Sequence, residues 1–303
     1  MTTSSRSLLA IEPMEPKQIV SLLRLAKRMH YEKPRNILRG RRVVLLFYEA
    51  STRTRVSFEF AAKALGATTA VVSATASSIE KGESLLDTGA TLRALGADAI
   101  VIRHPSSGAP GLLARNLDIP IINAGDGMHE HPSQGLLDAF TILEHKGDLH
   151  GLRVTIVGDV FHSRVARSDV HLLSKFGAKI TLCGPPALVP DNALALAPGI
   201  RISQNLDESL HGADVVILLR VQKERLQGLE LDVHEYTVNY QLTRERLRLA
   251  RRGVIVLHPG PIMRGMELTD DIADGSQNVI LDQVRNGVSV RMAILAYALG
   301  GAR

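Results

Sequence analysis

Short runs of hydrophobic residues alternate with stretches of helical spacing along the whole chain. The apolar runs at residues 43–47, 99–102, 154–157 and 254–257 have the length and the β-branched content of buried strands. Between such runs, apolar residues recur at the spacing of an amphipathic helix. Strands that alternate with helices in this way are typical of an α/β protein with parallel sheets.

The helical spacing also predicts where individual helices lie. The first is expected over residues 15–30, where Pro16 suits the first turn. A helix that begins at Pro132 is expected to bridge two halves of the chain. Shorter patterns predict a helix over residues 244–250 and a last helix over residues 288–299, which is apolar enough to pack back against the first half.

The pattern starts again after Gly147, so we expect two doubly wound parallel-sheet domains. The first is predicted to comprise residues 1–132 with a C-terminal helix at about 288–303, and the second residues 133–287. Ligands of doubly wound domains bind at the carboxyl ends of the strands. Polar residues that directly follow apolar runs are therefore the candidate site residues.

Hydroxyl and guanidinium side chains gather between the first strand and the helix after it. They are Ser51, Thr52, Arg53, Thr54 and Arg55. Unpaired N–H groups and the positive end of the helix dipole favour an anion at such a place, and guanidinium groups suit phosphate or carboxylate. An ordinary serine-capped helix with two solvated arginines is the alternative. The concentration of anion-binding side chains at one turn favours a phosphate site.

Further polar clusters follow the later strands. They contain Arg103, His131 to Gln134, Arg164, Arg220 and His258 to Pro261. Taken singly, each cluster has a structural explanation: a surface cation, a helix cap or prolines in a loop. Together they place several arginines at strand ends, and guanidinium groups that converge on one cleft repel one another unless negative charge fills it. The ligands are therefore expected to carry several negative charges.

Composition narrows the class of protein. The 303-residue chain is 45% hydrophobic, and its net charge of +5 suits an anionic ligand. Nucleic acid is disfavoured, since there is no block of Lys and Arg and aromatic residues make up only 4%. The only cysteine, Cys183, excludes an internal disulfide and a Cys-rich metal site, and we expect it to be buried. No signal peptide or membrane-spanning stretch is evident, so a cytoplasmic location is expected.

Two familiar motifs are not supported. Gly125 and Gly127 lack the third glycine of a dinucleotide fingerprint, because Glu130 stands at that position, and no P-loop is present. His129 and His131 have a spacing found in some metal hydrolases, but Pro132 indicates that His131 serves the entry of a helix. We therefore expect neither a metal nor a cofactor.

The clusters resemble the signatures of a known family, the carbamoyltransferases, and the resemblance covers nearly the whole chain. Ser51-Thr-Arg-Thr-Arg55 resembles the carbamoyl-phosphate signature, and His131-Pro-Ser-Gln134 the second signature. Ornithine-specific members typically carry a cysteine in the second signature, a His-Cys-Leu-Pro segment and a Ser-Met-Gly loop. This chain has Ser133, His258-Pro-Gly-Pro261 and no Ser-Met-Gly, and residues 220–225 are similar to the aspartate-specific version.

The charge of the second-substrate side also favours an aspartate-specific member, because Arg164 and Arg220 suit a dicarboxylate better than a cationic side chain. One departure from the better-known regulated enzyme is Gly260, where that enzyme has leucine. Only backbone contacts are therefore carried over at this position.

The resemblance implies a role for each residue. The phosphate is held by Ser51, Thr52, Arg53 and Thr54. The carbonyl is polarised by Arg103 and His131 together with Thr54, and the carbamoyl NH₂ is held by Gln134. The carboxylates of aspartate are bound by Arg164, Arg220 and Gln222, and by the backbone near Pro259 and Gly260. Ser77 and Lys81 reach in from the neighbouring subunit of a trimer.

The implied reaction is transfer of the carbamoyl group of carbamoyl phosphate to the amine of L-aspartate, in pyrimidine biosynthesis. Residues 1–132 would bind carbamoyl phosphate and residues 133–287 aspartate. Glu49 is expected to organise Arg103, Arg164 or Arg225 rather than to act as a base, and the departing phosphate to collect the proton. The implied assembly is a homotrimer with shared active sites, and the sequence leaves open whether a regulatory or dihydroorotase-like chain binds in addition.

Three alternatives remain open at this point. The chain could transfer the carbamoyl group to ornithine or another amine, or it could be a catalytically inactive structural homologue. It could also be a plain anion-binding module.

Overall fold

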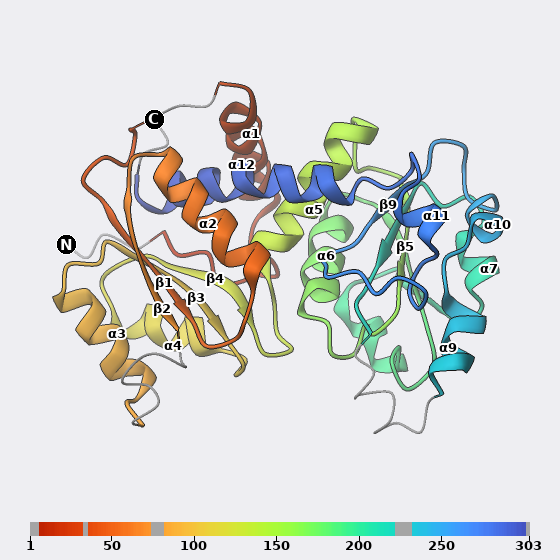
Figure 1. The fold of residues 1–303 in the computed structure, drawn as a ribbon, viewed down its shortest axis with the longest axis horizontal. Coiled ribbons are helices and arrows are strands. Elements are labelled where there is room, and N and C mark those ends of the chain that lie inside the picture. Colours follow the sequence, from red (N-terminus) through yellow and green to blue (C-terminus); the bar gives the residue numbers. More distant parts are fainter. Residues whose placement is uncertain (1–5, 33–35, 74–81, 222–231, 301–303) are drawn as a thin grey trace. The chain divides into compact units, whose positions relative to one another are not determined.

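The computed structural model describes residues 6–32, 36–73, 82–221 and 232–300. The chain forms two compact units, one of Met1–Phe140 with Val284–Arg303 and one of Thr141–Gln283 (Figure 1). The chain passes from one unit to the other within α5 (Pro132–Lys146) and again within α12 (Ile280–Ala298). Each unit is an α/β structure around a parallel sheet, as the hydrophobic pattern predicts.

The first unit has a parallel sheet with the strand order β2-β1-β3-β4. The strands are β1 (Arg42–Phe47), β2 (Thr68–Ser73), β3 (Ala99–His104) and β4 (Ile121–Asp126). The helices that lie wholly in this unit are α1 (Pro16–Tyr31), α2 (Thr52–Ala64), α3 (Leu85–Ala94) and α4 (Ala109–Asn116). Val44 and Leu46 of β1 pack with Leu92 of α3 and Leu113 of α4, and Figure 1 shows α2 and α12 across the other face of the sheet. Residues 43–47 are buried throughout because both faces of β1 are covered.

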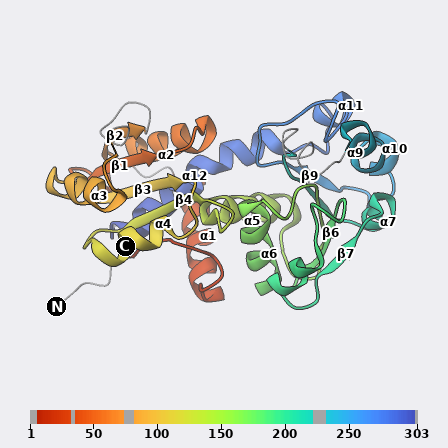
Figure 2. The same cartoon turned by 90° about the horizontal axis from the view of Figure 1, so that it is seen from below.

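The second unit has a parallel sheet with the order β7-β6-β5-β8-β9. Figure 2 shows β6 next to β7 in this sheet. Its strands are β5 (Arg153–Val157), β6 (Lys179–Cys183), β7 (Arg201–Ser203), β8 (Val215–Leu218) and β9 (Ile255–Leu257). Its helices are α6 (Arg164–Lys175), η3 (Asp191–Leu196), α7 (Leu206–Leu210), α9 (Val233–Tyr240), α10 (Arg244–Leu247) and α11 (Asp270–Ala273). Cys183 ends β6 and is fully buried, as expected, within the hydrophobic core of this unit.

Two helix boundaries predicted from the sequence are wrong. The last helix begins at Ile280 rather than at 288, because Gln283 and Asn286 look like surface residues yet are buried. The side-chain oxygen of Gln283 accepts a hydrogen bond from the backbone N–H of His258 at 3.1 Å. In addition, α10 ends at Leu247 rather than at 250, because the chain there turns through i→i−3 bonds such as Ala250 N to Leu247 O.

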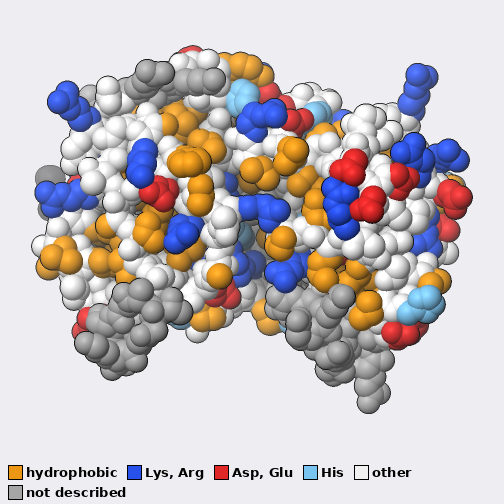
Figure 3. All heavy atoms as spheres, viewed as in Figure 1, with side chains coloured by type: hydrophobic (Ala, Val, Ile, Leu, Met, Phe, Trp, Pro, Cys, Tyr) orange, Lys and Arg blue, Asp and Glu red, His pale blue; other side chains and the backbone are white. Residues whose placement is uncertain are grey.

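The outer surface of the first unit carries hydrophobic side chains among basic ones. Phe60 of α2 is 58% exposed, and Figure 3 shows hydrophobic side chains over the region of α2. Among the described residues, no helix combines the length and the apolar character that crossing a bilayer requires.

Candidate active site

The predicted phosphate residues lie where the strand order of the first sheet reverses, between β1 and β3. This switch point is where doubly wound sheets bind their ligands. Because β1 and β3 are hydrogen-bonded neighbours, their carboxyl ends lie close together: Tyr48 N, directly after β1, donates to the O of Arg103, which lies within β3 rather than after it as expected, at 2.9 Å. Arg103 Nε lies 3.2 Å from Glu49 Oε2 in an ion pair. Glu49 thus contacts Arg103, one of the arginines that it was expected to organise.

The start of α2 is open to an anion. Ser51 is the N-cap residue, with extended backbone, and its side chain makes no capping hydrogen bond. Ser51 thus stands at the cap position of the serine-capped alternative without making its side-chain bond, and Arg53 and Arg55 are exposed, as that alternative expects. The first N–H groups of an α-helix have no partner within it, so the amides of the first turn are left for a ligand. Thr54 is buried, whereas Thr52 and Arg53 are exposed.

The second signature begins α5. His131 is 3% exposed, and its Nδ1 lies 3.3 Å from the Ser133 hydroxyl. Gln134 donates from Nε2 to Asp138 Oδ1 at 2.9 Å, one helical turn further along. A carboxylate accepts only, so this bond orients the Gln134 amide and leaves its oxygen as the acceptor for a substrate NH₂.

A buried arginine lies beside this network, and the sequence gives little sign of it. Arg291 of α12 is 3% exposed, and its guanidinium carbon is 5.2 Å from the centre of the Phe58 ring. Burial lowers the pKa of Arg291 to about 10, and the negative charge of Asp138 opposes that shift. Asp138 and Arg291 were missed because only the fold brings residues 138 and 291 together.

The possible metal site at His129 and His131 is occupied by structural contacts instead. His129 Nδ1 lies 3.1 Å from Asp126 Oδ2, and this hydrogen bond raises the pKa of His129. Glu130 accepts hydrogen bonds from the backbone N–H groups of Ile11 and Glu12 at 2.8 and 3.0 Å. In the part of the chain that the structure describes, no group of three His, Cys, Asp or Glu side chains is placed to hold a metal ion.

The second unit carries its predicted residues at the corresponding place, where the strand order reverses between β5 and β8. Arg164 is the first residue of α6, and Arg220 follows β8 and is exposed. The two strands are joined beyond their regular ends, since Leu219 N donates to Val157 O at 2.8 Å. Gly158 has φ +120°, and a Cβ there would lie 3.0 Å from Leu219 O, so the close approach of the two loops requires glycine.

The loop after β9 holds His258, Pro259 and Gly260. His258 is 2% exposed; its Nδ1 accepts from Gly260 N at 2.8 Å and its Nε2 lies 2.7 Å from Glu267 Oε2. Glu267 Oε1 in turn accepts from Val221 N, directly after Arg220, at 2.9 Å. Glu267 was also missed, because nothing near it in the chain marks a buried carboxylate.

Three predicted site residues, Ser77, Lys81 and Gln222, lie outside the described residues. Their roles stay predictions.

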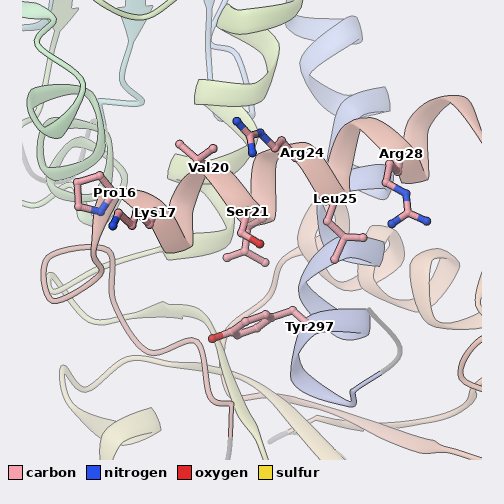
Figure 4. A pocket seen from close by; sticks show the side chains of 9 residues that line it. Pro16, Lys17, Val20, Ser21, Arg24, Leu25, Arg28 and Tyr297 are labelled. Atoms are coloured by element: carbon pink, nitrogen blue, oxygen red, sulfur yellow. The ribbon is translucent and has the colours of Figure 1, made fainter. Parts of the chain in front are cut away.

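A surface groove lies elsewhere in the first unit. It has a volume of about 500 Å³ and is lined by α1 and by Tyr297 of α12, with Lys17, Arg24 and Arg28 among apolar side chains (Figure 4). It contains none of the predicted substrate residues, and nothing in the structure shows what covers it. We therefore assign it no role.

Comparison with known proteins decides the family. Residues 6–144 match the model of the aspartate/ornithine carbamoyltransferase carbamoyl-phosphate-binding domain, and residues 150–298 match that of the Asp/Orn-binding domain. The chain belongs to the aspartate/ornithine carbamoyltransferase family. The family resemblance read from the motifs is thus confirmed.

Individual carbamoyltransferases are similar over their full length. The aspartate carbamoyltransferase catalytic subunit of Koribacter versatilis is 67% identical over 294 residues, which cover 97% of each chain. The aspartate transcarbamoylase of Trypanosoma cruzi, solved with carbamoyl aspartate and phosphate, superposes with a TM-score of 0.87 at 33% identity, over 97% of this chain and 95% of that one. The ornithine carbamoyltransferase of Pyrococcus furiosus superposes with a TM-score of 0.88 at 28% identity, over 99% of both chains. Since both kinds of enzyme superpose equally well, the fold does not separate the two amine substrates.

Proposed function

We propose that this carbamoyltransferase transfers the carbamoyl group of carbamoyl phosphate to the amine of L-aspartate, which yields N-carbamoyl-L-aspartate and phosphate. The observation that carries the proposal is the 67% identity, over 97% of the chain, to an aspartate carbamoyltransferase catalytic subunit. The second-substrate side supports it, because Arg164 and Arg220 at the strand ends suit two carboxylates.

The first unit binds carbamoyl phosphate in this scheme. The phosphate lies at the start of α2, where the amides of the first turn, the hydroxyls of Ser51, Thr52 and Thr54 and the Arg53 guanidinium donate to its oxygens. Gln134 accepts from the carbamoyl NH₂ through its side-chain oxygen, since its amide nitrogen is engaged by Asp138.

The carbonyl oxygen becomes an oxyanion when the amine attacks. Arg103, His131 and Thr54 donate to it. In this scheme the neutral His131 ring carries its proton on Nε2 and presents that N–H to the oxyanion, while Nδ1 accepts from the Ser133 hydroxyl 3.3 Å away. Each such donor contributes about 3–4 kcal/mol to stabilising the transition state.

The second unit binds aspartate. Arg164, Arg220 and Gln222 receive the carboxylates, with the backbone at Pro259 and Gly260. The attacking amine is neutral, and the departing phosphate takes its proton. Glu49 is engaged by Arg103 and positions that guanidinium rather than acting as a base. Holding both substrates in attack geometry contributes roughly 7–11 kcal/mol more.

The assembly proposed is a homotrimer in which Ser77 and Lys81 complete the site of a neighbouring subunit. The family resemblance supports it. The cytoplasmic location expected from the sequence stays a prediction. Subunits with Lys81→Ala and subunits with Arg53→Ala, each inactive alone, should regain part of the activity when mixed. No recovery in trimers that demonstrably exchange subunits excludes a shared site.

Steady-state assays test the reaction itself. Aspartate should be carbamoylated with a far higher kcat/KM than ornithine, and Arg53→Ala should reduce that value by about 10²-fold or more. Lys63→Ala removes an exposed cation from the same helix, where Lys63 pairs only with Glu59 among the contacts described, and should leave kcat/KM unchanged. A preference for ornithine, or a fully active Arg53→Ala, would show that the proposal is wrong.

A further inference from the structure

A buried glutamate connects two loops of the second unit that each contain a predicted aspartate-binding group. Glu267 is 1% exposed, and three donors converge on its carboxylate. Oε1 accepts from Val221 N at 2.9 Å, while Oε2 accepts from Met263 N at 2.9 Å and from His258 Nε2 at 2.7 Å. Val221 is joined to Arg220 after β8, and His258 follows β9. The carboxylate therefore ties the end of β8 to the end of β9.

His258 links Glu267 to the backbone of the next two residues, Pro259 and Gly260. Its Nδ1 accepts from Gly260 N at 2.8 Å, so the neutral ring carries its proton on Nε2 and donates that proton to Glu267. His258 is 2% exposed, so both bonds are shielded from solvent. The ring thus holds the backbone at Pro259 and Gly260 in a defined place relative to Glu267.

We propose that Glu267 is a positioning residue of the aspartate site. Through Val221 it sets the place of Arg220, and through His258 it sets the backbone at Pro259 and Gly260. It contacts no substrate itself. The proposal rests on the proposed function, since it takes these groups as the ones that hold aspartate.

The site requires a carboxylate rather than an amide. Carboxylate oxygens only accept, and here they face two backbone N–H groups and a ring N–H. In Glu267→Gln one oxygen becomes an NH₂ group, which then faces a donor. If the His258 ring moves its proton to Nδ1 to accept from that NH₂, the Nδ1–H faces the N–H of Gly260 instead. With either tautomer, two N–H donors face each other without an acceptor between them, so the loop after β8 or the loop after β9 must move.

The measurement that tests this is the kinetic behaviour of Glu267→Gln. The displaced groups bind aspartate equally in its ground and transition states, so KM for aspartate should rise about 10- to 100-fold while kcat and KM for carbamoyl phosphate change less than about threefold. Glu267→Asp keeps an acceptor-only group on a shorter side chain and should give a smaller rise. Glu245→Gln is the matched control, because Glu245 is an exposed glutamate on α10, and it should behave as wild type.

His258→Asn tests the connection from its other end. An asparagine oxygen can accept from the N–H two residues on, as in an Asx turn, so the bond to Gly260 is kept while the donor to Glu267 is lost. KM for aspartate should rise here as well. The urea midpoint of every variant is measured alongside, and Glu267→Asp and His258→Asn carry the test if Glu267→Gln does not fold.

The outcomes separate the possibilities. A folded Glu267→Gln or His258→Asn with wild-type KM for aspartate overturns the proposal, and so does an equal rise in KM for both substrates, since Glu267 would then only stabilise the unit. If neither of these variants folds, a wild-type KM in Glu267→Asp overturns it. A wild-type enzyme that carbamoylates ornithine but not aspartate refutes the proposed function instead, and the same variants assayed with ornithine still decide whether Glu267 positions the second-substrate loops.

Discussion

Removing the charge of Asp138 should destabilise the first unit more than any surface substitution, because Arg291 would be left as a buried cation without a compensating charge. Asp138 is fully buried and Arg291 is 3% exposed. Asp138→Asn keeps the size of the side chain and an oxygen that can accept from Gln134, so the substitution changes mainly the charge.

The magnitude follows from the state of Arg291. Burial lowers the pKa of Arg291 to about 10 even with Asp138 present, so the charged form is disfavoured by about 3 kcal/mol relative to water. The group still carries its charge at neutral pH. Removing the negative charge that compensates a buried cation costs about 3–5 kcal/mol, and we expect Asp138→Asn to lose that much free energy of unfolding.

The assay is a double-mutant cycle. Arg291→Met alone leaves the Asp138 charge in the core and should also destabilise, whereas Asp138→Asn with Arg291→Met removes both charges and should recover most of the loss. Urea unfolding is followed by circular dichroism, because the chain has no tryptophan, and at one protein concentration, because assembly changes apparent stability. Lys63→Met is the control. It breaks an exposed pair with Glu59 and should cost at most about 1 kcal/mol.

The reasoning is refuted if the two single substitutions are additive in the double variant to within about 0.5 kcal/mol. It is also refuted if Asp138→Asn costs no more than Lys63→Met.

Three further predictions concern other parts of the chain. Burial raises the pKa of the Cys183 thiol to about 11. A thiol reagent at pH 8 should therefore leave the native protein unmodified and label its single cysteine only in denaturant. Labelling of the native protein at the rate of a free thiol would contradict this prediction. The hydrogen bond that His129 donates to Asp126 raises the pKa of His129. A raised pKa contributes stability that is complete below the ordinary value near 6.5 and is lost as pH rises through the raised value. The advantage of wild type over His129→Gln in urea midpoint should therefore be larger at pH 6 than at pH 9, and an advantage that grows with pH would show that the sign is wrong. Gly127 has φ +48°, and a Cβ there would lie 2.6 Å from Ser107 N, so Gly127→Ala should lower the free energy of unfolding by about 1–3 kcal/mol. Gly147→Ala is the control: a Cβ there meets open space, so this substitution should cost only the strain of its positive φ.

Much of the architecture could be predicted from local patterns. The run at residues 43–47 is apolar without interruption, and β1 is indeed covered on both faces. Glu49 and Arg103 were placed at the carboxyl ends of strands, and parallel strands bring such residues to one edge of their sheet, although β3 extends through Arg103 to His104. Arg103 and Glu49 therefore meet at 3.2 Å although they are distant in the chain.

Other features could not be predicted because one residue type can have two different structural roles. Ser51 has the residue type of a helix cap, and only the structure shows that its side chain does not cap α2. Gln283 looks like a surface residue, yet it is buried because His258 N supplies its hydrogen bond. The predicted start of the last helix was wrong for that reason.

The sequence by itself determined the α/β class, the strands, the polar residues at their carboxyl ends and the membership of a carbamoyltransferase family. The tertiary structure alone decided which distant group acts on each buried charge, Asp138 on Arg291 and His258 on Glu267. The physical reason is that burial of an apolar face leaves a periodic trace along one element, whereas a buried charge is stabilised by whichever distant group the fold brings to it.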